Sequence, residues 1–299
     1  MGYLFLFLAL AFGIIKAYCG KRTSSSALCS YDAIVITTVR MACCIAISLA
    51  VVLLSRDNLT VLVTPKMLAI GAFSGISIAC FTVCWLLSVR SLAYMMVEVF
   101  VMGGTVITLA FSYILYKEQV RGMQIVGIVL LVIAVYCMCT NNTRDRASLS
   151  KKSFLLLLLC AVSSAFSDFS QKMFVKEVVG VSASVFNLYT YLFAAVVLFF
   201  ASFVFKLNEK GSALRKPLVI VKPILHYVLI MALCLFLNSF FKTNAAKYID
   251  AVSLYPLNQG CAVLLSLAMS VLIFKEKATP KGLFGIALSI VAMILINVN

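Results

Sequence analysis

Three ionisable residues, Arg40, Glu98 and Asp168, lie well inside long apolar runs of this chain. A charge at the centre of a membrane helix costs on the order of a few kcal/mol or more, so such a side chain usually faces a partner or a polar cavity. An arginine can hold a carboxylate through two parallel hydrogen bonds, and a carboxylate can hold an amine or take up a proton. These residues therefore indicate a buried polar site.

Arg40 and Glu98 are expected about 10 Å inside the same membrane face, on two helices that run in the same direction. They could form a buried ion pair that fixes the packing of the two helices. Alternatively, Arg40 holds a substrate carboxylate, or Glu98 takes a proton or a substrate amine. A third interpretation is that a charge reaches the membrane surface along its flexible side chain. The sequence leaves these alternatives open.

Asp168 is expected about 22 Å from the start and about 12 Å from the end of its helix, too deep for its short side chain to reach water easily. Lys172 follows one turn later in "DFSQK", a spacing that permits an intrahelical ion pair. One interpretation is a neutralised pair in a cavity wall. The other is a carboxylate that loads and unloads a coupling proton, because a low dielectric favours the neutral acid.

Polar side chains of other helices complete the set of candidate site residues. In "YPLNQG", from Tyr255 to Gly260, two amides follow a proline that removes one backbone hydrogen bond of the helix. Free backbone groups beside polar side chains are typical of binding sites at the membrane midplane, and interhelical hydrogen bonding is the alternative. These further candidates are Asn187, Tyr191, Asn238, Lys242, Asn258, Gln259 and Trp85, of which Trp85 could stack on substrate or anchor its helix at the membrane interface.

The elements that carry these residues are predicted to be membrane-spanning helices. Of 299 residues, 64% are apolar or aromatic and 12% are charged, and the mean hydropathy of +1.11 excludes an ordinary soluble domain. A helix needs about 20 mostly apolar residues to cross a bilayer. We therefore expect an all-α integral membrane protein with ten transmembrane helices. The ten runs lie near residues 2–19, 33–55, 67–88, 91–116, 120–140, 153–175, 183–205, 224–247, 250–274 and 280–298.

The charge distribution predicts an orientation and excludes a nucleic-acid partner. Although the net charge is +15, 23 of the 25 basic residues lie in links or near helix ends. The first, third, fifth, seventh and ninth links hold 15 Lys or Arg, and the other four hold eight. Because basic residues are retained in the cytoplasm, we expect a plasma-membrane protein with a cytoplasmic central linker and both termini outside. The eleven cysteines are interpreted as packing residues, and neither a metal nor a cofactor is expected.

A charged motif occurs twice in the chain. The segment from Leu109 to Ala134 aligns without a gap to the segment from Leu267 to Ala292, with nine identical residues in 26 positions. Each Glu of the motif is expected near the first turn of a helix, and each Gly inside that helix, where it permits close helix contact. The identical polar and glycine positions are Lys117/Lys275, Glu118/Glu276 and Gly127/Gly285.

This repeat predicts two five-helix halves, residues 1–140 and 153–299, joined by a polar linker at 141–152. Because five is an odd number, the second half must begin at the membrane face opposite to that of the first. Inverted repeats of this kind are typical of secondary transporters, whose two halves surround a site near the membrane midplane.

The segments "GGTVITLAFSYILYKE" and "QIVGIVLLVIAV", repeated as "GCAVLLSLAMSVLIFKE" and "GLFGIALSIVAM", resemble the bacterial drug/metabolite transporter superfamily, specifically its ten-helix EamA-type members. The resemblance covers essentially the whole chain. It implies export or exchange of small metabolites such as amino acids, without ATP. Family members often carry a proline in the front part of helices four and nine; Pro256 fits this pattern, whereas the equivalent residue of the first half is Glu98.

The sequence thus predicts a secondary transporter that moves a small polar metabolite by alternating access, as a monomer or a homodimer in a lipid bilayer. The alternative is a lipid-linked sugar carrier or flippase of the same fold. An enzyme is not expected, because the chain contains neither HExxH nor GxSxG. An ATP-driven pump is not expected either, because GxxxxGK[ST] is absent.

Overall fold

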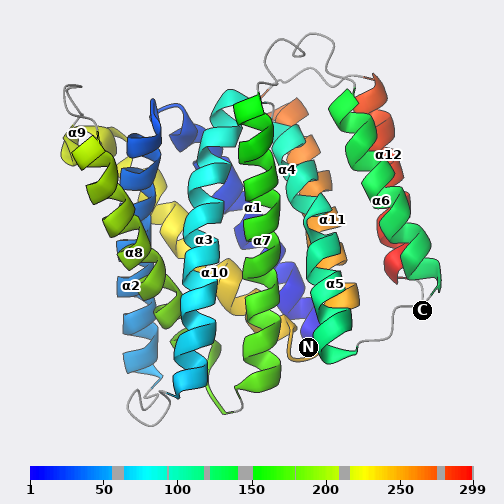
Figure 1. The fold of residues 1–299 in the computed structure, drawn as a ribbon, viewed down its shortest axis with the longest axis horizontal. Helices are drawn as coiled ribbons and strands as arrows, with labels where there is room; N and C mark the ends of the chain where they lie inside the picture. The colour runs from blue at the N-terminus through cyan, green and yellow to red at the C-terminus, as the bar shows by residue number, and fades with distance from the viewer. Residues whose placement is uncertain are drawn as a thin grey trace.

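The fold is known from a computed structural model that describes residues 1–55, 64–92, 94–117, 122–140, 151–178, 180–208, 216–274 and 280–297. Within these ranges the chain forms helices and no strand, and the helices run up and down beside one another (Figure 1). They are α1 (Gly2–Ser24), α2 (Ser30–Leu54), α3 (Pro65–Ser91), α4 (Tyr94–Gly103), α5 (Thr105–Tyr116), α6 (Gly122–Thr140), α7 (Lys151–Glu177), α8 (Ala183–Asn208), α9 (Pro217–Val221), the 3₁₀ helix η1 (Lys222–Ile224), α10 (Leu225–Ala245), α11 (Ala251–Leu272) and α12 (Pro280–Asn297).

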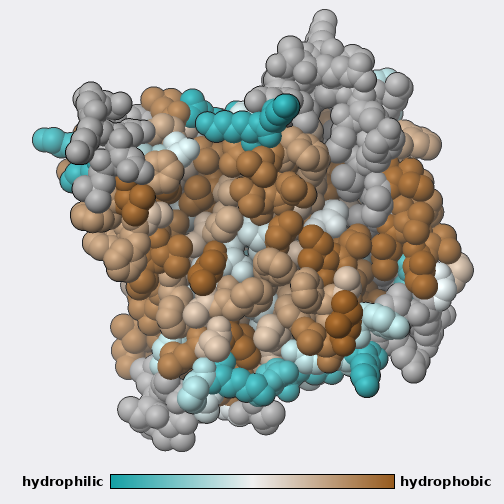
Figure 2. Space-filling model, viewed as in Figure 1, coloured by the Kyte–Doolittle hydropathy of each residue, from teal (hydrophilic) through white to brown (hydrophobic). Residues whose placement is uncertain are grey.

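The helices have the lengths and surfaces of a multi-pass membrane protein. Eight helical stretches of the described chain are long and apolar enough to cross a bilayer; α4 and α5 together contribute one, and α9 to α10 contribute another. The remaining two predicted runs form α6 and α12, of 19 and 18 residues. Figure 2 shows a broad hydrophobic band between hydrophilic residues at the upper and lower edges of the molecule.

Two helices differ from the sequence prediction in ways that affect the site. The first helix continues to Ser24 instead of ending near residue 19, with Lys21 and Arg22 in its last turn, where cations interact favourably with the negative end of the helix. The fourth run is divided into α4 and α5 at Gly104, whose backbone N–H donates to the carbonyl groups of Phe100 and Val101. A side chain at Gly104 would collide with the carbonyl oxygen of α7 that lies against it.

The repeated motif marks helix boundaries and one helix contact. Lys117 follows the last residue of α5 in the left-handed conformation, with φ of 51°. Gly127 in α6 and Gly285 in α12 are buried, and α6 packs against α12. The two Glu residues of the motif, at 118 and 276, and its second Lys, at 275, lie outside the described residues.

The two halves of the bundle interlock, because most large helix contacts join an element before residue 140 to one after residue 151. α1 packs on α10 and α3 packs on α7, while α2 packs on α8, α4 and α5 on α11, and α6 on α12. The smaller contacts of α1 with α11, and of α7 with α4 and α5, follow the same plan. In Figure 1, α1 begins at the lower side of the bundle, whereas α7 begins at the upper side.

Gly75 allows α3 and α8 to approach closely. A Cβ atom at this position would lie 2.6 Å from the Cβ of Phe193 and 2.8 Å from the carbonyl oxygen of Thr190. Backbone on α8 cannot retreat as a flexible side chain would. Small residues at such contacts allow membrane helices to pack through van der Waals contact, which is a main source of their association.

We therefore expect Gly75→Ala to lower the free energy of unfolding by about 1–3 kcal/mol, the usual cost of overpacking a tight core. The measurement is thermal unfolding of the purified protein in detergent. Gly122→Ala is the matched control, because a Cβ there would meet nothing within 4 Å. Equal stability of the two variants would show that α3 and α8 do not pack as closely as described.

Candidate functional site

A polar cavity of about 120 Å³ lies between the two halves of the bundle. It is lined by residues of α1, α2, α3 and α4 from the first half and of α7, α10 and α11 from the second. Its volume is sufficient for several water molecules or part of a small metabolite. Its ionisable lining residues with formal charge are Lys16, Arg40, Glu98, Asp168 and Lys242.

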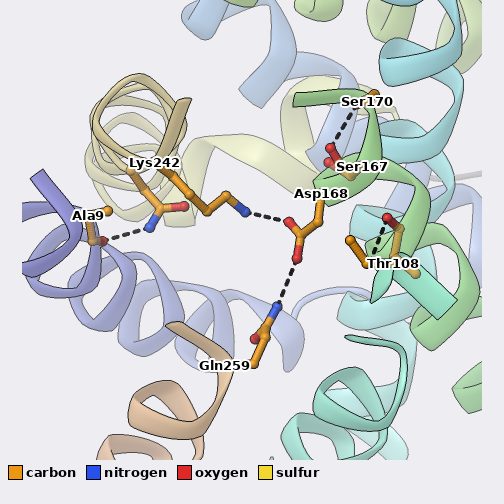
Figure 3. Close-up of polar contacts among 9 residues, drawn as sticks. Ala9, Thr108, Ser167, Asp168, Ser170, Lys242 and Gln259 are labelled. Atoms are coloured by element: carbon orange, nitrogen blue, oxygen red, sulfur yellow. Dashed lines mark hydrogen bonds and ion pairs between the residues drawn. The ribbon is translucent and has the colours of Figure 1, made fainter. Parts of the chain in front are cut away.

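Asp168 is the centre of the best-defined polar cluster in this cavity. Lys242 Nζ of α10 lies 2.6 Å from Asp168 Oδ1, and Gln259 Nε2 of α11 donates to Oδ2 at 3.4 Å. Figure 3 shows both side chains converging on the carboxylate from different helices. All three residues are at least nine-tenths buried. The cluster therefore joins α7, α10 and α11 through a single carboxylate.

This cluster corrects the predicted partner of Asp168. The ion pair of Asp168 is interhelical, with Lys242, rather than the intrahelical pair with Lys172 that the sequence spacing suggested. Lys172 is 1% exposed but does not line the cavity, and its ammonium lies 3.9 Å from Asp250 Oδ1. Lys242 is near the end of α10, yet it is 8% exposed because its side chain extends into the bundle.

Glu98 is part of a second cluster, formed by the first half of the chain. Trp85 Nε1 donates to Glu98 Oε1 at 2.9 Å, and the Trp85 ring makes an edge contact with Tyr94. Gly20 of α1 leaves room for the indole, since a Cβ there would lie 2.6 Å from the ring. Trp85 is 8% exposed and lines the cavity, so it does not anchor its helix from the lipid-facing surface; stacking on substrate stays a prediction.

The predicted ion pair between Arg40 and Glu98 is not present among the described residues. α2 begins at Ser30, so Arg40 lies ten residues inside its helix, whereas Glu98 lies only four residues after Tyr94. Arg40 therefore lies six residues farther from the start of its helix than Glu98 does. Arg40 is 4% exposed, and its Nε and Nη2 atoms have no hydrogen-bond partner within the described part of the chain.

Lys16 is a cavity residue that the sequence reasoning missed. It lines the cavity from α1, close enough to Glu98, Arg40, Asp168 and Lys242 to interact with them electrostatically. With the first helix expected to end near residue 19, Lys16 lay three residues from that end and was not considered as a site residue. Because α1 continues to Ser24, Lys16 lies about 12 Å inside the helix end. The continuous run of helix-compatible residues up to Ser24 was the signal that could have identified it.

Asn238 and Asn258, two more of the predicted amides, occupy the cavity wall. Asn238 Nδ2 of α10 donates to the carbonyl oxygen of Ala9 in α1 at 2.6 Å, a bond between the two halves. Asn258 lines the cavity after Pro256, and its buried Oδ1 has no hydrogen-bond partner in the described chain. This oxygen is available to a ligand that carries a hydrogen-bond donor.

Two other candidates are buried away from the cavity. Asn187 and Tyr191 both lie in α8, are nearly inaccessible to solvent and do not line the cavity. The Tyr191 hydroxyl donates to the carbonyl oxygen of Leu235 at 3.4 Å, which joins α8 to α10. The structure thus places eight of the eleven predicted site residues on the cavity and the three others, Lys172, Asn187 and Tyr191, outside it.

Comparison with known proteins agrees with this architecture. A sequence model of the EamA-like transporter family matches residues 1–140 and again residues 151–298. The chain belongs to the EamA-like transporter family. Because this is a family of membrane transporters within the drug/metabolite transporter group, the resemblance inferred from the repeated segments is confirmed.

Solved structures show the same fold, and 28 chains among them match. A crystal structure described only as "Crystal structure of protein" has a TM-score of 0.70 and 15% sequence identity, over 99% of this chain and 97% of the other. At this identity the likeness shows the fold alone. Comparison with curated proteins gave no match.

The Asp168 ion pair allows a double-mutant test of the site geometry. Asp168→Asn or Lys242→Gln alone should lower the free energy of unfolding by about 3 kcal/mol, because each leaves a buried charge without its partner. The double variant Asp168→Asn/Lys242→Gln should recover most of that loss. Denaturant or thermal unfolding of the purified protein measures all three.

The control double variant is Asp168→Asn/Lys172→Gln, which should recover nothing. If this control restores stability and the Lys242 double variant does not, then Asp168 pairs along its own helix and the interhelical assignment is wrong.

Proposed function

We propose that the chain is a secondary transporter that exports or exchanges a small polar metabolite by alternating access through the cavity. The observation that carries the proposal is the position of the cavity between two interlocked halves, with charged side chains supplied by both. A site between two moving halves can be exposed first to one side of the membrane and then to the other. Family membership supports transport, and the site geometry supports a charged or zwitterionic metabolite, for example an amino acid-like compound.

We also propose that the two family matches are inverted five-helix repeats. Counting α4 with α5, and α9 with α10, gives five membrane segments in each half. In this correspondence α1 matches α7, α3 matches α10, and α2, α4/α5 and α6 match α8, α11 and α12. The contact of α1 with α10 then corresponds to that of α7 with α3, and the contacts α2–α8, α6–α12 and α4/α5–α11 each join two equivalent helices. A two-fold relation between the halves explains this pattern. The opposite starting sides of α1 and α7 in Figure 1 support an axis in the membrane plane.

A proton is our proposed coupling ion, with Asp168 as the carboxylate that carries it. Protonation of Asp168 would remove the ion pair with Lys242 and weaken the link between α7 and α10. Loading a proton would thereby change how strongly the elements around the cavity are held together. This connects occupancy of one buried acid to a conformational change, as coupled transport requires.

Counterflow in proteoliposomes tests transport and coupling together. Vesicles containing the purified protein and a high internal concentration of an unlabelled metabolite should transiently accumulate the labelled compound, without ATP. Asp168→Asn should retain this exchange but lose most of its pH dependence, because the amide imitates the protonated acid. Amino acids, organic acids, amines and polyols form the panel.

Asp250→Asn is the matched control, since this carboxylate is 78% exposed at the start of α11 and should leave the pH dependence unchanged. Uptake that requires ATP, or no exchange of any panel compound by correctly folded protein, would contradict the proposed transport. Unchanged pH dependence in Asp168→Asn would remove this residue from coupling.

We propose that the upper side of the bundle in Figure 1 faces the cytoplasm of a plasma-membrane protein. Two of the eight basic residues assigned to the less basic side, Lys172 and Lys242, are buried inside the bundle. Without them the bias is 15 to six, which strengthens the orientation inferred from the links. In this orientation the linker 141–152 is cytoplasmic and both termini are outside. Residues 141–150 of the linker lie outside the described part of the chain.

Thiol labelling of intact cells tests this orientation. One variant retains Cys29 as its sole cysteine, and the other carries Tyr248→Cys in a cysteine-free chain; both positions are exposed, in the α1–α2 and α10–α11 links. A membrane-impermeant reagent should label Tyr248→Cys and leave Cys29 unlabelled until the membrane is disrupted. The opposite labelling pattern would reverse the proposed orientation.

A further inference from the structure

The lining of the cavity carries more positive than negative charge. Three cations, Lys16, Arg40 and Lys242, face two carboxylates, Glu98 and Asp168. The 2.6 Å contact between Lys242 and Asp168 makes those two a neutral pair. Among the described residues, neither carboxylate forms an ion pair with Lys16 or Arg40. The uncompensated positive charge therefore lies at the part of the cavity formed by α1 and α2.

Arg40 lines the cavity with hydrogen-bond donors that have no acceptor among the described residues. Its guanidinium has no hydrogen bond to any described residue, and two of its nitrogen atoms are completely buried. Cys44 and Tyr191, which interact with Arg40 electrostatically, donate to backbone carbonyl oxygens of α10. A buried guanidinium with free donors is strongly unfavourable unless a ligand supplies acceptors. Its planar donor pairs match an oxyanion, to which they can form two parallel hydrogen bonds.

Lys16 provides a second cation with free donors. Its ammonium makes neither a hydrogen bond nor an ion pair with the residues that the structure describes, and it lines the same cavity as Arg40. The two side chains come from consecutive helices of the first half, α1 and α2. The acid that the first half contributes to the cavity, Glu98 of α4, accepts a hydrogen bond from Trp85. A guanidinium and an ammonium that face one cavity form a natural receptor for a negatively charged group.

We propose that Arg40 and Lys16 form an oxyanion subsite and that the transported metabolite is a small monoanionic organic acid whose carboxylate binds there. This inference rests on the proposed transport function and names its substrate class. One negative charge on the substrate neutralises the cavity lining. A phosphate ester could use the same donors, but its charge of about −1.5 to −2 would exceed the excess positive charge. The free Asn258 Oδ1 offers an acceptor for a hydroxyl or ammonium group elsewhere on the same molecule.

Thermal unfolding of the purified full chain at constant ionic strength tests the subsite. The added compounds are sodium lactate, sodium glutamate, sodium phosphate, neutral alanine and sodium chloride as the reference. Lactate and glutamate should raise the Tm of the wild type more than alanine or phosphate does, because ligands that bind the folded state stabilise it. Arg40→Gln should bind these anions at least tenfold more weakly, and Lys16→Gln at least threefold more weakly.

Arg90→Gln is the matched control, because it removes the same charge from a residue outside the cavity that donates to the Ala27 carbonyl oxygen. It should bind lactate and glutamate as the wild type does. A second readout needs no ligand: Arg40→Gln should unfold at a higher temperature than the wild type in chloride, because an uncompensated buried charge has been removed. A purely structural role of Arg40 predicts the opposite sign.

Equal anion-induced stabilisation of wild type and Arg40→Gln would overturn the subsite. A larger Arg40-dependent effect of phosphate than of either carboxylate would overturn the carboxylate assignment. Anion binding that depends on Arg40, without counterflow of any compound, would contradict the proposed transport function alone. Counterflow of neutral compounds by Arg40→Gln at the wild-type rate would contradict this inference alone.

Discussion

The bundle is surrounded by hydrocarbon, so any ionised side chain inside it must find its partner within the bundle. Asp168 meets this requirement through Lys242 and Gln259, which hold α7, α10 and α11 around one carboxylate. Each charge of this pair has its partner inside the bundle, which is what allows both to be buried. All three residues line the cavity between the two halves, so a ligand bound there could compete for these partners.

Packing and chemistry are distributed differently over the two halves. Most helix contacts made by one half have an equivalent contact made by the matching helices of the other half, as expected for two related units. The charged residues of the cavity do not follow this equivalence. The first half contributes two cations and one acid, and the second half contributes one cation and one acid. The shared framework agrees with the family model matching each half of the chain, and the differing side chains account for the excess of positive charge in the cavity lining.

The sequence predicted the helices well because long uninterrupted apolar runs leave little choice of structure in a membrane. It also identified Arg40, Glu98 and Asp168 as cavity residues, since a charge deep in such a run has few other positions available. It did not identify their partners. The pairing of Asp168 with Lys242 joins residues 74 positions apart, whereas sequence spacing reveals only neighbours on the same helix, such as Lys172. Lys16 was missed because an error of five residues at a helix end changed its apparent depth.

The fourth membrane segment is interrupted at Gly104 and the ninth contains Pro256, and these two residues are not equivalent positions of the repeat. In the first half the break at Gly104 follows Glu98, so the acid lies on the short helix α4, while α5 stays attached to α7 through the bond from Thr108 to the Ala165 carbonyl oxygen. In α11, Pro256 precedes the cavity amides. A bend at Gly104 would therefore move Glu98 together with the short helix α4. A bend at Pro256 would leave Asn258 and Gln259 on the longer part of α11. Because the two bends would move helix arms of different length, an asymmetric preference for one direction of movement could arise from the backbone alone.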